Sequence, residues 1–269
     1  MKKYIFLHIP KNAGTTLHNV LECNWSPWST FHIKYPRSIS LAILSRLPVS
    51  KLNEICFIKG HQPFGIHRIF ENSDEWQYFT MVRDPVRRVV SELAYIRRNH
   101  PDLIPSNLDD IDIVRNYSIF HNAQTRFIAG DDVGLNDESY SYTSCAGEVY
   151  NRSINNLNNK FVYVGLVEEF DDSLSSLAAS INLRFTGYMT RNADRTGRNS
   201  SISSSLEAAI LDYNRDDAEL YRRAKAGEWG FRKFTKQVKK LEGISLVDRG
   251  YMTYRRIICR IIWSMRWKP

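Results

Sequence analysis

The sequence predicts an α/β fold of three layers, in which a central, mainly parallel sheet of roughly four to five strands lies between helices. Short apolar runs alternate with longer stretches of helical periodicity, as in sheets that are built with crossover helices. The apolar runs are mostly hydrophobic without strict alternation, which is typical of strands buried on both faces. The expected strands are residues 4–9, 55–59, 76–82 and 161–166. The expected helices are residues 15–23, 85–99, 117–129, 168–181, 204–226 and 232–241.

Composition and charge restrict the class of protein. The chain has 269 residues, of which 43% are hydrophobic and 25% charged, so disordered and fibrous classes are excluded. The net charge is +8, and residues 251–269 hold five of the cations and no acid, which leaves only +3 for residues 1–250. A field of this size does not predict nucleic acid as a partner. Polar stretches at residues 100–112, 131–158 and 191–205 are expected to be loops.

The chain divides into a domain at residues 1–250 and a basic tail at residues 251–269. In a helix, the isoleucines of the tail share one face and its arginines the other. Two interpretations stay open: a last helix that packs on the domain, or a helix that lies on an anionic membrane surface. No run of about 18 apolar residues predicts a transmembrane helix. We expect a cytoplasmic protein, with peripheral membrane contact through the tail as the alternative.

The four cysteines indicate neither a metal centre nor a disulfide framework. Cys23, Cys56, Cys145 and Cys259 are far apart, and no CxxC pair is present. A zinc site is therefore not expected, and the cysteine usage favours a reducing compartment.

The first candidate site follows the first expected strand. Residues 8–16, His-Ile-Pro-Lys-Asn-Ala-Gly-Thr-Thr, join this strand to a helix. Small residues let the backbone approach a ligand, and the free N–H groups at a helix start favour an anion. This pattern predicts a phosphate cradle, and a plain turn with a threonine cap is the alternative. The cradle residues are Lys11, Asn12, Ala13, Gly14, Thr15 and Thr16.

The order of these residues argues against an ATPase or a GTPase. In the Walker A pattern the lysine follows the last glycine, whereas here Lys11 precedes Gly14. The loop is also shorter than the Walker loop, so a different anion geometry is expected.

A second candidate site follows the third expected strand. Arg83 comes at the strand's carboxyl end, where open α/β sheets bind ligands. Asp84 is suited to cap the next helix and Pro85 to occupy its first position. Ser91 comes about two turns later and is expected to face the same crevice. The alternatives are an ion pair for Arg83 and a packing role for Ser91.

Together, residues 8–16 and the segment Val-Arg-Asp-Pro-Val-Arg-Arg-Val-Val-Ser at 82–91 resemble the sulfotransferases that use 3′-phosphoadenosine 5′-phosphosulfate (PAPS). The resemblance is closest to the carbohydrate branch that includes heparan sulfate 2-O-sulfotransferase, and it extends over roughly residues 4–240. It implies a P-loop-like fold. Segments 122–127 and 164–170 resemble a helix and a strand-to-helix turn of the branch.

The resemblance implies a role for each motif. Lys11, Thr15 and Thr16 would bind the 5′-phosphosulfate, and Arg83 and Ser91 the 3′-phosphate. Two more cofactor-binding residues are expected in the polar loop, Arg195 and Arg198. PAPS carries about four negative charges near neutral pH, which suits two separate cationic sites. No metal is expected to be required, and the product would be 3′,5′-bisphosphoadenosine.

A histidine is the expected general base, because its pKa lies near neutral pH. His61 follows the second expected strand and therefore comes to the same sheet edge as Lys11 and Arg83. In the branch that the chain resembles, a Gly-His at this place has the base role. His67 is the second choice, and His121 is expected to face the cleft. His8 is expected in the core.

The leading functional hypothesis is in-line transfer of a sulfuryl group from PAPS to an acceptor hydroxyl, with His61 as base and Lys11 stabilising the leaving oxygen. The resemblance favours a carbohydrate acceptor, and the absence of a Golgi-type anchor favours a bacterial source. Loops at residues 24–50 and 100–116 are expected to form the acceptor pocket. The alternatives are a nucleotide-dependent small-molecule kinase and a basic, membrane-associated binding module.

Overall fold

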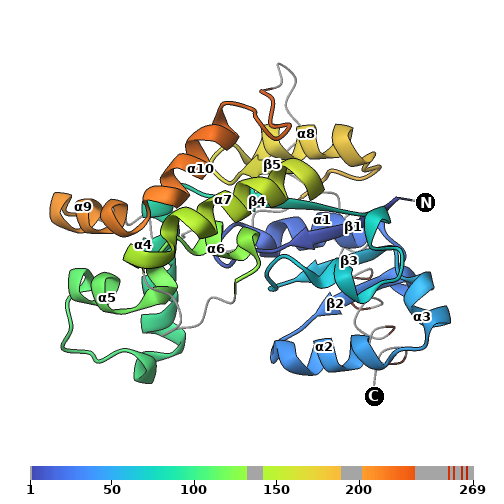
Figure 1. The fold of residues 1–269 in the computed structure, drawn as a ribbon, viewed down its shortest axis with the longest axis horizontal. Coiled ribbons are helices and arrows are strands. Elements are labelled where there is room, and N and C mark those ends of the chain that lie inside the picture. Colours follow the sequence, from blue (N-terminus) through green and yellow to red (C-terminus); the bar gives the residue numbers. More distant parts are fainter. Residues whose placement is uncertain are drawn as a thin grey trace.

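The computed structural model describes residues 2–131, 142–188 and 202–233, with side chains in the helix at 142–160 described from residue 147, and the single residues 254, 257, 262 and 265. At its centre lies a five-stranded parallel sheet in the order β2-β3-β1-β4-β5 (Figure 1). The predicted α/β class is confirmed. The strands are β1 (Lys3–Leu7), β2 (Thr30–Ile33), β3 (Phe57–Gly60), β4 (Trp76–Val82) and β5 (Phe161–Leu166).

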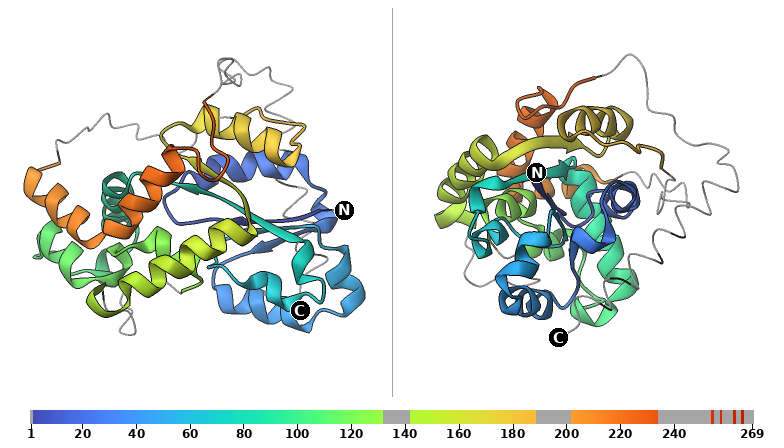
Figure 2. Two further views of the ribbon diagram at one scale, coloured as in Figure 1. Left: turned by 45° about the horizontal axis from the view of Figure 1, so that its top comes forward. Right: turned by 90° about the vertical axis from the view of Figure 1, so that its right-hand side faces the viewer.

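Helices cover both faces of the sheet and give the three layers. Helices α1 and α8 pack on one face (Figure 2). Helices α2, α6, α7 and α10 contribute apolar side chains to the other. A smaller apolar cluster joins α4, α5 and α9 beside the sheet. The helices are α1 (Gly14–Asn24), α2 (Arg37–Arg46), α3 (Val49–Glu54), α4 (Pro85–Asn99), α5 (Asp110–Asn116), α6 (Ala123–Ala129), α7 (Tyr142–Lys160), α8 (Phe170–Ile181), α9 (Ser204–Tyr213) and α10 (Arg215–Lys225).

The strand order creates a switch point between β1 and β4. From β1 the chain moves to β2 and β3 on one side, and it then crosses to β4 and β5 on the other. The loops that follow β1 and β4 therefore leave in opposite directions, and sheets of this kind bind ligands at such a point. Leu7 and Ile33 both pair with Gly60, so β1, β2 and β3 end at one edge.

Several elements differ from the sequence prediction, among them helix α2 and part of helix α3, which lie where loops were expected. Strand β2 was not predicted, because it is a four-residue edge strand whose side chains alternate between half-buried and buried. Helix α7 occupies most of the segment 131–158 that was expected to be a loop. Its polar, asparagine-rich surface hides a buried stripe at Val149, Ser153 and Leu157, which are spaced by one helical turn.

Several helix boundaries also differ. The helix expected at residues 204–226 is two helices, α9 and α10, which are separated at Asn214. The helix expected at 117–129 begins only at Ala123, because residues 118–120 form a 3-10 turn and Asn122 is left-handed. Part of the loop expected at 100–112 is α5, which Asp109 caps. Segments 191–205 and 232–241 lie almost entirely outside the described residues.

Little of the basic tail belongs to the described residues. Ile262 is buried, whereas Tyr254, Ile257 and Met265 are exposed. Within the described ranges, no helix combines the length and the apolar character needed to cross a membrane.

Gly60 ends β3 in a conformation that L side chains rarely adopt. Its φ is +146°, and a Cβ at this position would lie 2.4 Å from the carbonyl oxygen of Ile33. We expect Gly60→Ala to lower the free energy of unfolding by at least about 1–3 kcal/mol, the usual cost of such strain. The matched control is Gly147→Ala in α7, where a Cβ has open space. The control should be stabilising by roughly 0.5–1 kcal/mol. Urea unfolding measures both, and equal effects would contradict this explanation of Gly60.

Candidate functional site

The loop between β1 and α1 presents free backbone donors at a helix start. Lys11 and Ala13 have positive φ angles of 68° and 55°, which turn the chain sharply into α1. The N–H groups of Thr16 and Leu17 donate to the Ala13 carbonyl, 3.1 and 3.2 Å away. The N–H groups of the two preceding residues, Gly14 and Thr15, have no hydrogen-bond partner among the described residues. Together with the positive end of the helix dipole, they are suited to accept an anion, as the predicted cradle requires.

The structure does not support the alternative of a plain turn with a threonine cap. The N-cap residue is Ala13, and no side chain caps the helix. Gly14 is required for another reason, since a Cβ there would lie 1.6 Å from Nε2 of His8. The loop is thus shaped by the close approach of His8 and leaves its donors free.

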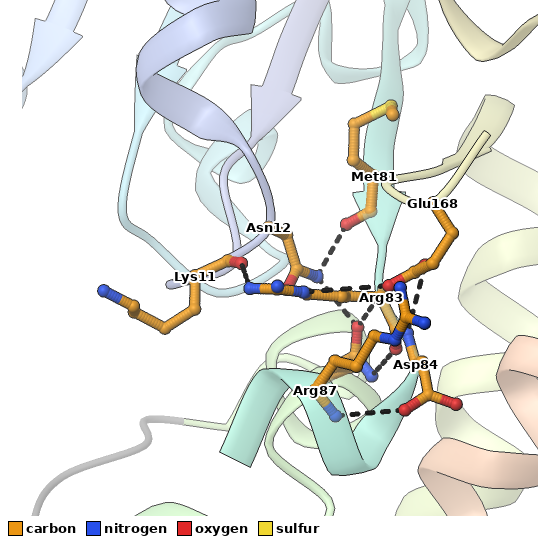
Figure 3. Close-up of polar contacts among 8 residues, drawn as sticks. Lys11, Asn12, Met81, Arg83, Asp84, Arg87 and Glu168 are labelled. Carbon is orange, nitrogen blue, oxygen red and sulfur yellow. Dashed lines mark hydrogen bonds and ion pairs between the residues drawn. The ribbon is translucent and has the colours of Figure 1, made fainter. Parts of the chain in front are cut away.

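Arg83 follows the end of β4 and contacts this loop. Its Nη1 donates to the carbonyl oxygen of Lys11 at 3.1 Å, and its Nε lies 3.7 Å from the carboxylate of Glu168 (Figure 3). Burial lowers the pKa of the Arg83 guanidinium, and Glu168 opposes this effect. The ion pair that was the alternative for Arg83 therefore exists, but at a distance that leaves Arg83 Nε without a hydrogen bond among the described residues.

The predicted start of α4 is confirmed. Pro85 occupies the first turn, and Asp84 accepts a hydrogen bond of 3.0 Å from the N–H of Arg87. The N–H of Asp84 donates to Glu168 at 3.3 Å. Glu168, which sequence reasoning did not assign a role, thus contacts both the strand end and the helix cap.

Lys11 and Ser91 face a shared space beside α4. Lys11 Nζ lies 4.2 Å from the centre of the Tyr95 ring, and its side chain points away from Arg83 (Figure 3). Ser91 is one helical turn before Tyr95 and therefore on the same helix face. Burial lowers the pKa of the Lys11 ammonium, and the carboxylate of Glu92 raises it. Ser91 is half-buried, and its hydroxyl has no hydrogen-bond partner among the residues of the described ranges.

A buried amide joins the two anion-binding segments. Gln124 of α6 accepts hydrogen bonds of 2.8 Å from Asn12 Nδ2 and from the N–H of Arg83, and donates one of 2.8 Å to the Arg83 carbonyl. Asn12 Nδ2 also donates to the carbonyl of Met81 at 2.8 Å. The sequence predicts no role for Gln124 itself. A hydrogen bond between residues that are far apart in the chain leaves no pattern that a single sequence shows.

His61 stands at the same edge with a defined tautomer. Its Nδ1 lies 3.0 Å from the carbonyl oxygen of His8, which can only accept, so Nδ1 donates and Nε2 keeps its lone pair. The rings of His61 and His8 stack with centres 3.9 Å apart. The residue is open to solvent on one side, yet the atoms packed around its ring lower its pKa by desolvation. A neutral imidazole with a free nitrogen suits a general base.

Further histidines lie behind His61. Nδ1 of His8 and Nε2 of His18 are 3.0 Å apart, and the ring centres of His18 and His32 are 5.4 Å apart. Burial holds the pKa values of His8 and His18 well below their usual range, and the charge of Lys59 lowers both further. His8 is buried as expected, but its contact with His61 was not foreseen. Across the described residues, no group of three or more His, Cys, Asp or Glu side chains is arranged to hold a metal ion.

The two alternative bases are committed to packing. Nδ1 of His67 lies 2.8 Å from the hydroxyl of buried Tyr78, and burial lowers the pKa of His67 to about 4. His121 is buried against the ring of Tyr213 and donates to the carbonyl of Val114 at 2.7 Å. Both lie below the surface and are not oriented as His61 is.

Arg195, Arg198, Cys259 and the side chain of Cys145 lie outside the described residues. The two described thiols, Cys23 and Cys56, do not form a disulfide with each other.

Comparisons with known proteins found similarity among solved structures. Neither a protein-family model nor a curated protein matches the chain. Among solved structures, the crystal structure of mouse sulfotransferase SULT7A1 complexed with PAP is similar over 97% of this chain and 88% of that chain, with 15% identity and a TM-score of 0.36. A similarity at this level carries no functional argument and gives no support to the heparan sulfate 2-O branch. The function must therefore be argued from the residues of the site.

The buried histidines predict a dependence of stability on pH. Because the pKa values of His8 and His18 are lowered, the unfolded chain takes up protons below about pH 6.5 while the folded protein does not. The free energy of unfolding should therefore be highest above that pH and fall as the pH decreases. His18→Gln should reduce this slope by up to about 1.4 kcal/mol per pH unit. Urea unfolding across pH 5–8 (roughly the range in which histidine titrates) tests this, with His100→Gln as the exposed control. An unchanged slope in His18→Gln would refute the assignment.

Proposed function

We propose that the chain is a sulfotransferase, which transfers a sulfuryl group from PAPS to a hydroxyl group of an acceptor. One observation carries the proposal: a helix start with free N–H groups and a strand-end arginine meet at the switch point of a parallel sheet. The first belongs to the loop after β1, and the second is Arg83, whose guanidinium donates to the carbonyl of Lys11 in that loop. We assign one anionic group to the helix start with Lys11 and the other to Arg83 with Ser91. PAPS has two anionic groups, the 5′-phosphosulfate and the 3′-phosphate, on one nucleoside.

The residues of the site fit this nucleotide. The N–H groups of Gly14 and Thr15 are available to the 5′-phosphosulfate, and Gly14 has no Cβ in the way. Arg83 has a buried Nε without a hydrogen bond, which the 3′-phosphate would satisfy together with the hydroxyl of Ser91. When bound, PAPS supplies the sulfuryl group.

The chain's own side chains would then have distinct tasks. Lys11 carries a flexible ammonium that can turn from the Tyr95 ring to the cradle, where it would stabilise charge on the leaving oxygen. His61 would accept the proton of the acceptor hydroxyl at Nε2, while the carbonyl of His8 holds its ring in position. Sulfuryl transfer, like phosphoryl transfer, depends mainly on such placement and charge stabilisation.

A sugar hydroxyl is the proposed acceptor group. His61 is open to solvent, so the acceptor can approach from outside the sheet edge. Tyr35, which is 97% exposed, follows β2 at the same edge and offers an aromatic face. The segment 24–50 that was expected to form acceptor loops instead contains η1 (Pro27–Ser29), β2, α2 and part of α3. Strand β2 and helix α2, which flank Tyr35 in the sequence, would fix its position.

Nucleotide binding tests the proposal against the kinase alternative. The wild-type protein should bind 3′,5′-bisphosphoadenosine in the presence of EDTA, and it should bind Mg-ATP much more weakly. Tight binding of Mg-ATP without binding of the bisphosphate would favour a kinase.

Arg83→Ala should weaken binding of the bisphosphate by roughly 10- to 150-fold, which corresponds to loss of one charge-assisted contact. Binding of adenosine 5′-phosphate should change by less than about 3-fold, because that ligand lacks the 3′-phosphate. Isothermal titration calorimetry measures both ligands, with the exposed Arg97→Ala of α4 as control. An equal loss for the two ligands would disprove the assignment of Arg83 to the 3′-phosphate.

His61→Ala should lower kcat by about 10²–10⁴-fold and leave affinity for the bisphosphate nearly unchanged. The acidic limb of the pH–rate profile should disappear, and in the wild type it should lie below about pH 6.5 because the pKa of His61 is lowered. The assay follows transfer of radiolabelled sulfate from PAPS to a panel of glycans, lipids and small alcohols, with His100→Ala as control. A variant that keeps turnover within a few-fold of wild type would rule out the base role.

A further inference from the structure

The helix α6 lies beneath both anion-binding segments, and the proposed reaction makes no use of it. Its residue Gln124 is completely buried. The side-chain amide makes three hydrogen bonds of 2.8 Å, one to the Asn12 amide and two to the backbone of Arg83. One side chain therefore contacts the loop after β1 and the end of β4 at the same time.

We propose that Gln124 is a positioning residue that holds the cradle and Arg83 at a fixed spacing, so that a nucleotide with two phosphate groups binds to both as one unit. The identity of that nucleotide rests on the proposed function. The spacing itself is a property of the ligand-free chain.

The chemistry of these contacts requires an amide. Gln124 Oε1 accepts a hydrogen bond from the Arg83 N–H, and Gln124 Nε2 donates one to the Arg83 carbonyl. The side-chain amide thus pairs with Arg83 as the backbone of a neighbouring strand would. The same Oε1 uses its second lone pair for Asn12 Nδ2. A glutamate at this position could still accept hydrogen bonds from Asn12 and from the Arg83 N–H. It would, however, place a negatively charged oxygen against the carbonyl oxygen of Arg83. A leucine would leave all three groups without their partner.

Gln124 is itself fixed by α10. The carboxylate of buried Asp217 accepts hydrogen bonds from the N–H groups of Gln124 and Thr125, at 3.1 and 2.8 Å, and from the Thr125 hydroxyl at 2.8 Å. This carboxylate sits at the start of α6, where the helix dipole favours a negative charge. Asn122 accepts from the N–H of Asp217 at 3.2 Å and so ties the same turn to α10.

The guanidinium of Arg88 interacts with the carboxylate of Asp217 inside the protein. Arg88 is buried, and the carboxylate of Asp217 acts on it to raise its pKa against the lowering effect of burial. The amide that joins the two anion-binding segments is thus attached to the core and does not depend on a surface loop.

A fixed spacing affects ligands with one and two phosphate groups differently. When the two sites are held at the right spacing, binding of the second phosphate costs no further conformational entropy of the protein. The bisphosphate therefore binds more tightly than either monophosphate. If the sites move independently, part of that gain disappears while each site still binds its own phosphate. A residue that only stabilises the fold would change all ligands alike.

The test uses Gln124→Leu and the milder Gln124→Glu in the full chain. Calorimetry measures binding of 3′,5′-bisphosphoadenosine, adenosine 5′-phosphate and adenosine 3′-phosphate, well below the melting temperature of each variant. For Gln124→Leu we expect about a 10- to 100-fold loss for the bisphosphate and less than about 3-fold for each monophosphate. Gln124→Glu should have an intermediate effect, and it serves alone if the leucine variant does not fold.

The matched control is Asn24→Leu. Asn24 is also an amide with several backbone hydrogen bonds, but it joins α1 to Arg184 and Phe185, away from the crevice. It should lower thermal stability and leave the ratio of the three affinities unchanged.

Hydrogen exchange of the ligand-free protein gives a second readout that needs no nucleotide. The hydrogen-bonded amides of Asn12 and Thr16 should exchange faster in the Gln124 variants and as in wild type in Asn24→Leu. If the wild type binds none of the nucleotides, the proposed function fails, and the exchange result still decides the role of Gln124. Equal losses for the three ligands, or unchanged exchange at Asn12 and Thr16, would overturn the inference.

Discussion

Three hydrogen bonds from one buried amide hold the two ends of the candidate site together. A parallel sheet brings the carboxyl ends of β1 and β4 to one edge, but it does not determine how the loops beyond them are spaced. Gln124 supplies that spacing through Asn12 and the backbone of Arg83, and Asp217 fixes Gln124 in turn. The cradle, the guanidinium and the imidazole are therefore attached to the core of the fold.

The positive charges of Lys11 and Arg83 are only partly neutralised by nearby carboxylates. Burial lowers the pKa values of Lys11 and Arg83, and one carboxylate, Glu168, lies 3.7 Å from Arg83. Arg83 contacts Glu168 and the Lys11 carbonyl, and Lys11 lies beside the Tyr95 ring. These contacts compensate the two cations only in part, which suits a site for an anion. His61 is kept neutral by the same surroundings that keep His8 neutral beneath it. Two cationic side chains and an imidazole of lowered pKa thus follow three neighbouring strands of the sheet.

Much of the framework could be predicted from the sequence, because buried parallel strands and helix caps have local signals. Strands β1, β3, β4 and β5 and the Asp84-Pro85 start of α4 are confirmed. Strand β2 and helix α7 were missed, since a short edge strand and a polar helix have weak hydrophobic patterns. The two anion motifs were found because each is a contiguous segment at a strand end.

The supporting residues of the site could not be predicted in this way. Gln124 lies 112 positions from Asn12 and 41 from Arg83, and Glu168 lies 84 from Asp84. Their roles depend on tertiary contacts that no local spacing records. His8 looked like a core residue and is one, yet its carbonyl sets the tautomer of His61. A single sequence identifies the groups that touch a ligand more readily than the groups that position them.

The most direct test of this account is a crystal structure of the chain with 3′,5′-bisphosphoadenosine. The account predicts the 5′-phosphate at the N–H groups of Gly14 and Thr15 and the 3′-phosphate at Arg83 and Ser91. It also predicts that Gln124 keeps its contacts with Asn12 and Arg83. A nucleotide bound elsewhere, or one whose 3′-phosphate lies away from Arg83, would contradict it.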